Sequence, residues 1–109
     1  MDEELSYFKQ HLDFLKALKN SSAEKLQKKL RFILPQQLKF LVECALNIKK
    51  GVIPLESSGL KKAVSHRAAY QELLKKSNSL KFKKELLLDN PKFVRHLASI
   101  CVDSFDQNE

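Results

Sequence analysis

The feature of this chain that most constrains its fold is an apolar stretch between two prolines, Pro35 and Pro54. Its apolar residues recur at steps of three and four, namely Leu38, Leu41, Val42, Ala45, Leu46 and Ile48. That spacing places them on one face of a helix. A proline is tolerated in a first helical turn, and Gly51 can close the last turn in a left-handed conformation. We therefore predict a central helix over residues 35–50, with Leu41 and Leu46 buried in the core.

The scarcity of turn-forming residues indicates that the rest of the chain is helical too. The 109 residues include two Gly and three Pro, and Val and Ile are sparse beside Leu, Lys and Glu. This balance favours helices over a sheet. A hydrophobic content of 43% suffices for a core, and the length suits one domain. We predict an all-α fold in which residues 1–109 form a compact single-domain bundle of five or six helices, with residues 105–109 as candidates for a flexible end.

Capping residues and apolar spacing set the expected limits of the other helices. The helices expected besides the central one cover residues 3–19, 23–34, 57–76, 80–88 and 91–104. Ser21 and Glu24 have the spacing of a capping box, which would start the second of these. Ser79 can cap the helix that follows it, and Pro91 suits a first turn. No domain linker or internal repeat separates these segments.

Charge is distributed unevenly along the chain, whose formal net charge is +7. Residues 1–22 have a net charge of −1, residues 23–95 of +11 and residues 96–109 of −3. A basic centre favours polyanions, either nucleic acid or an anionic membrane surface, although lysine-rich faces can also serve only for solubility. Lysines outnumber arginines by 17 to three. Because lysines act as point charges on phosphates, binding is expected to be to the backbone and weakly sequence-specific.

The candidate nucleic-acid contacts are the lysines of the predicted helices that follow residue 22. They are Lys25, Lys28, Lys29, Lys61, Lys62, Lys81, Lys83 and Lys84. Three phenylalanines, Phe32, Phe40 and Phe82, lie near lysines in the sequence, which is a weak indication of base stacking, because phenylalanine at helical spacing is more often a core residue.

No pattern of catalytic or metal-binding residues is present in the sequence. The histidines His11, His66 and His96 are isolated and unpaired with carboxylates, and the two glycines are too few for a nucleotide-binding loop. We expect no enzyme activity, no cofactor, no metal and no small-molecule substrate. Cys44 and Cys101 fall on apolar helix faces, so they are expected to be buried and unbridged in a reducing compartment. The chain shows no signal peptide and no apolar run of membrane-spanning length, so no membrane association is expected.

The middle of the chain carries a motif and a following lysine run that resemble a known family. In the segment ECALNIKKGVIPL, the matching residues are Cys44, Ala45, Asn47, Gly51, Pro54 and Leu55, and a run SLKFKKELLL begins at Ser79. Over about residues 38–93 the chain resembles small basic helical proteins of Maverick/Polinton-type elements and related eukaryotic DNA viruses. The resemblance implies a mobile element or virus, a nucleic-acid partner with DNA favoured over RNA, and a nuclear or virion-associated location.

Two classes of function follow from these observations. The first is a non-enzymatic nucleic-acid-binding protein that coats or packages DNA. The alternative is a helical interaction or oligomerisation module, an adaptor or virion component, whose lysines only keep it soluble. The wide apolar stripe of the first predicted helix, residues 3–19, also allows a homodimer. The first class needs most of the candidate lysines on one continuous face, whereas the second allows them to be scattered.

Overall fold

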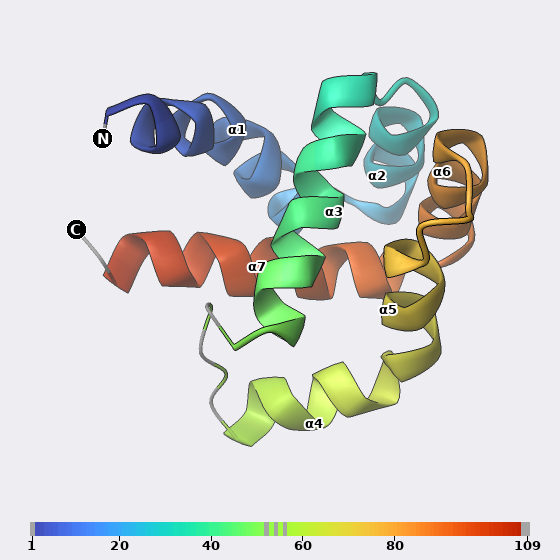
Figure 1. Ribbon diagram of the computed structural model, residues 1–109. Helices are drawn as coiled ribbons and strands as arrows, with labels where there is room; N and C mark the ends of the chain where they lie inside the picture. The colour runs from blue at the N-terminus through green and yellow to red at the C-terminus, as the bar shows by residue number, and fades with distance from the viewer. Residues whose placement is uncertain (1, 52, 54, 56, 108–109) are drawn as a thin grey trace.

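The chain folds into seven helices within the residues that the computed structural model describes, which are 2–51, 53, 55 and 57–107. They are α1 (Asp2–Asn20), α2 (Ala23–Arg31), α3 (Pro35–Lys49), α4 (Ser57–Ser65), α5 (Arg67–Leu74), α6 (Leu80–Asp89) and α7 (Pro91–Gln107) (Figure 1). The radius of gyration is 13.1 Å, close to the roughly 13 Å of a compact domain of this length. The predicted all-α compact fold is confirmed, but with seven helices rather than five or six. Residues 105–107, expected as part of a flexible end, belong to α7, and residues 108–109 lie outside the described residues.

Local hydrogen bonds fix where the helices start. The Ser79 hydroxyl accepts from the Phe82 N–H at 3.1 Å and caps α6, as predicted. α2 begins at the expected residue but is capped by Ser22, whose hydroxyl accepts from the Lys25 N–H at 3.3 Å. The predicted cap, Ser21, instead donates its hydroxyl hydrogen to the Ala17 carbonyl at the end of α1.

α3 has the boundaries that its flanking residues predict. Pro35 is its first residue, where the missing N–H costs no intrahelical bond. The Gln37 side chain accepts from the Leu34 N–H at 2.9 Å and so satisfies a donor in front of the helix. Past its end, Gly51 has a φ of +79°, a conformation that glycine adopts without strain.

The helix predicted over residues 57–76 is divided in two at His66, which accounts for the additional helix. His66 has φ −103° and ψ 17°, outside the helical range, and its N–H is shared between the Lys62 and Ala63 carbonyls. Its ring packs against two rings of α7, with centroids 5.6 Å from Phe93 and 5.1 Å from His96. The turn lets α4 pack on α7 while α5 packs on α3 and α6.

The core lies where α3 crosses α7 in Figure 1. α7 packs against α1, α2, α3, α4 and α6, so this last helix touches more neighbours than the central helix of the sequence does. Fully buried side chains come from both, and include Phe40, Leu41, Phe93, Val94 and Leu97.

Burial confirms one of the two core predictions for α3 and corrects the other. Leu41 is fully buried, but Leu46 is 36% exposed. Leu46 lies about 200° around the helix from both Cys44 and Ile48, because each residue advances the helix by roughly 100°. The buried face of α3 is therefore centred on Cys44 and Ile48, and Leu46 lies on the opposite side. Both cysteines are buried and free, as predicted.

Candidate functional site

The structure divides the eight candidate lysines between two regions. α2 carries Lys25, Lys28 and Lys29; α6 carries Lys81, Lys83 and Lys84; and α4 carries Lys61 and Lys62. Helices α2 and α6 pack side by side, whereas α4 packs on α7 at the bottom of the view in Figure 1. Six of the lysines are therefore on one pair of helices, and the two on α4 are separate from them.

Helices α2 and α6 are held together in a defined register. The Gln27 side chain donates to the Leu88 carbonyl at 3.0 Å. The two helices run in opposite directions (Figure 1), so the part of α2 after Gln27 lies alongside the part of α6 before Leu88. The positively charged residues of α2 and α6 are therefore carried by one packed pair of helices. We call this the α2–α6 basic surface, made of Lys25, Lys28, Lys29, Arg31, Lys81, Lys83 and Lys84.

Acidic residues do not neutralise this surface. α2 has four basic residues and one acid, and α6 has three basic residues and two acids. Among the described side chains the ion pair formed is Lys19 Nζ to Asp103 Oδ1, at 3.1 Å, and it lies between α1 and α7. The positive charges of the α2–α6 basic surface are therefore free to meet an external anion.

The lysines of the surface differ in how firmly they are held. Lys25, Lys28, Lys29 and Lys81 are exposed, and Lys84 is half-buried. Lys83 is only 9% exposed. Its ammonium nitrogen is nevertheless not one of the fully buried polar atoms without a hydrogen-bond partner in the described residues. Its aliphatic stem is thus packed on the core while the charged end reaches the surface, a common arrangement for lysine.

Two aromatic side chains project from the same pair of helices. Phe32, which follows Arg31 at the end of α2, is 76% exposed, and Phe82, between Lys81 and Lys83, is 42% exposed. The expectation of a core position is wrong for both of them and correct for Phe40, which is fully buried. The sequence contains the signal, because Phe32 falls outside the stripe of Leu26, Leu30 and Ile33 that α2 and the turn after it bury.

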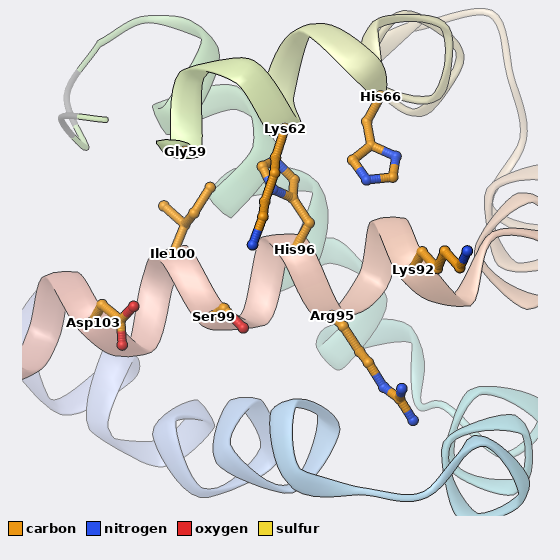
Figure 2. Close-up of a pocket in the computed structure, with 9 residues that line it drawn as sticks. All are labelled: Gly59, Lys62, His66, Lys92, Arg95, His96, Ser99, Ile100 and Asp103. Atoms are coloured by element: carbon orange, nitrogen blue, oxygen red, sulfur yellow. The ribbon is translucent and has the colours of Figure 1, made fainter. Parts of the chain in front are cut away.

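A second basic region is a groove between α4 and α7 with a volume of about 420 Å³ (Figure 2). The described residues that line it are Gly59, Lys62, His66, Lys92, Arg95, His96, Ser99, Ile100 and Asp103. Figure 2 shows the Lys62 side chain reaching from α4 toward α7, with the His66 and His96 rings in the gap between the two helices. Sequence spacing gave no sign of this groove, because its residues come together only through the turn at His66.

The electrostatics of the groove are dominated by positive groups. Tyr70 Oη and His96 Nε2 lie 2.6 Å apart and share a hydrogen bond. Burial, and then the neighbouring His66 and Lys62, lower the pKa of His96 to about 4. Burial and the charge of Lys92 also lower the pKa of His66. Both rings are therefore neutral near pH 7, and the fixed charges are those of the lysines, Arg95 and Asp103.

Comparison of the chain with protein-family models, curated proteins and solved structures finds no match. In the part of the chain that the structure describes, no three His, Cys, Asp or Glu side chains gather as they would around a metal ion. No helix there is long and apolar enough to cross a membrane. The functional argument therefore depends on the two basic regions.

Proposed function

We propose that the protein binds nucleic acid non-enzymatically, through contacts between the α2–α6 basic surface and the phosphate backbone. The observation that carries the proposal is the gathering of six candidate lysines and Arg31 on two packed helices, without an ion pair to any described acid. Polyanion affinity requires such a concentration of unneutralised charge on one part of the surface. A coating or packaging role for the DNA of a mobile element or virus is consistent with this mode of binding.

The composition of the surface supports weak sequence specificity. Direct base reading uses the planar forks of arginine or the amides of asparagine and glutamine. Here Arg31 is the single arginine of the surface, and Gln27 already donates to the Leu88 carbonyl. The remaining contacts are ammonium groups, which position a phosphate backbone and do not distinguish bases.

The proposal is tested by titrating the protein with labelled DNA and RNA of several sequences over a salt series. Affinity is expected to be similar between sequences and to fall by about 0.9 log units per log unit of salt for each phosphate neutralised on duplex DNA. No detectable binding at about 50 mM salt, where phosphate contacts are strongest, would contradict the proposal.

A second candidate function is favoured by exposed apolar side chains near the same helices. Leu34 and Leu80 are 49% and 40% exposed, and they accompany Phe32 and Phe82. Such residues are also suited to a protein partner or a second copy of the chain. Size measurement over a range of protein concentrations tests this alternative, since a homodimer would appear as a concentration-dependent rise in mass.

A further inference from the structure

The groove between α4 and α7 gathers positive groups that have no anion beside them. Lys62, Lys92 and Arg95 are among its lining residues, and of these three the Arg95 side chain is directed away from α4 (Figure 2). Among the described residues that line it, Asp103 is the one acid, and its carboxylate is already paired with Lys19 at 3.1 Å. The groove is thus left with an excess of positive charge.

Contacts within the groove show that its donors are not used up by the fold. Arg95 donates through Nη2 to the Ser21 carbonyl at 2.6 Å, but its buried Nε has no hydrogen-bond partner. Ser99 has no hydrogen bond of its hydroxyl within the described part of the chain. Lys62 and Lys92 form no ion pair there either. Burial is the main cause that lowers the pKa of both histidines, with a further contribution from Lys92 at His66, and from His66 and then Lys62 at His96. Like charges held together in a concave site mark it as a candidate for binding.

We propose that this groove binds a phosphate monoester group, as carried by a nucleotide or by the end of a nucleic-acid strand. Lys62 reaches from α4 toward α7, which carries Ser99, so an ammonium group and a hydroxyl group are available to donate to the phosphate oxygens. Lys92 supplies further charge from α7, whereas the Arg95 side chain is directed away from α4 toward the Ser21 carbonyl. A dianion suits the two lysine charges, because the one acid of the described lining is paired with Lys19. The volume of about 420 Å³ lies within the range of small-ligand sites.

The site is separate from the α2–α6 basic surface and does not depend on the function proposed for it. The sequence placed Lys61 and Lys62 together in a nucleic-acid face, but only Lys62 lines the groove. This difference provides a matched control, because both lysines are exposed on the same helix.

The test is NMR titration of the isotope-labelled chain with inorganic phosphate, adenosine monophosphate and adenosine, at constant ionic strength. Phosphate and the monophosphate are expected to shift the resonances of His66, His96 and Ser99, whereas adenosine leaves them unchanged. Lys62→Gln or Lys92→Gln should weaken binding by about fivefold, and Lys61→Gln should have little effect. Ser99→Ala should also weaken it without changing the charge of the groove.

A further arm compares single-stranded oligonucleotides with and without a 5′-phosphate, which separates a strand end from a free nucleotide as the source of the group. If the phosphorylated strand causes saturable shifts of the groove resonances and the unphosphorylated strand causes none, the groove binds the phosphorylated end of a strand. Shifts no larger than those from chloride, or an equal loss of affinity in Lys61→Gln and Lys62→Gln, would overturn the proposal. Neither outcome bears on binding at α2 and α6, which is measured with variants of those helices.

Discussion

At the scale of single residues, the buried hydrogen bond between His96 and Tyr70 connects the packing of α5 and α7 with the groove beside α4. His96 is 7% exposed and is hydrogen-bonded to Tyr70. Burial raises the pKa of the Tyr70 hydroxyl. The pair is therefore neutral over the whole physiological range. It anchors α5 to α7 directly beneath the basic groove, so a change of charge at His96 would disturb both the packing and the groove.

His96 is expected to make the fold sensitive to acid. Its pKa of about 4 in the folded chain is below the ordinary value of about 6.5, so the unfolded chain binds more protons between these values. The stabilising effect is present above about pH 6.5 and is lost as the pH falls toward 4, by up to about 3 kcal/mol. Urea unfolding at a series of pH values measures this. The difference between the unmodified chain and His96→Gln should shrink as the pH falls, and a difference independent of pH would contradict the assignment.

Two leucines of α3 form a matched pair for testing the core. Leu41→Ala should lower the free energy of unfolding by roughly 2–5 kcal/mol, because Leu41 is fully buried. Leu46→Ala should cost less than about 1 kcal/mol, because Leu46 is 36% exposed. Denaturant melts of both variants measure the two losses. Equal losses would mean that the described face of α3 is not the one that packs.

The two cysteines are expected to be unbridged and slow to react. The neighbouring Cys101 thiol and burial raise the pKa of the Cys44 thiol, so the reactive thiolate is scarce. Labelling with a thiol reagent should be slow in the native chain and fast in denaturant, with two groups modified. A mass two hydrogens lower in the non-reduced protein would instead reveal a disulfide.

At the scale of helices, the sequence predicted ends that depend on local chemistry and missed those that depend on tertiary contacts. The cap at Ser79, the proline at the start of α3 and the turn at Gly51 were all predictable, because each acts within a few residues. The break at His66 was not, since it depends on packing against Phe93 and His96, which follow about 30 residues later. The groove beside α4 depends on that break and was missed for the same reason.

Phe32 and Phe82 are expected to give the α2–α6 pair a preference for single strands. Exposed aromatic rings beside lysines can stack on unpaired bases, and each such stack contributes about 1–3 kcal/mol. Replacing both by alanine should weaken binding of single-stranded DNA by tenfold or more, at about 1.4 kcal/mol per tenfold, and change duplex binding little. Fluorescence anisotropy with matched single- and double-stranded probes measures this preference.

The control for this prediction is the double variant Leu34→Ala and Leu80→Ala, which removes exposed apolar groups that have no aromatic face. It should leave binding of both probes unchanged. An equal loss in the control and in the phenylalanine variant would indicate general apolar contact, and would favour a protein partner for this end of the molecule.

At the scale of the whole molecule, the all-α fold and its single-domain size were predictable from composition, because few residues form turns and helix-forming residues dominate. The division of the eight candidate lysines into two regions was not predictable. The lysines of α2 and those of α6 belong to one region only because α2 packs on α6, and Lys62 is separated from them because α4 packs on α7. The distribution of the lysines in three dimensions therefore depends on tertiary packing, which the sequence pattern does not reveal.

The most direct test of the proposed function is the affinity for DNA of two variants with equal net charge. The first replaces Lys28, Lys29, Lys81 and Lys84 of the α2–α6 basic surface by Glu. The second replaces Lys39, Lys49, Lys50 and Lys75, which are exposed elsewhere, by Glu. Each variant lowers the charge by about eight and leaves the buried apolar residues intact. Circular dichroism melts verify that both remain folded.

Binding is measured by fluorescence anisotropy at the same low salt concentration for the unmodified chain and both variants. If phosphates bind between α2 and α6, the first variant should lose detectable binding and a large part of the salt dependence, while the second retains measurable affinity. Equal loss in the two variants would show that only net charge matters. Retained binding in the first variant would place the nucleic acid elsewhere on the molecule and contradict the proposed function of the α2–α6 basic surface.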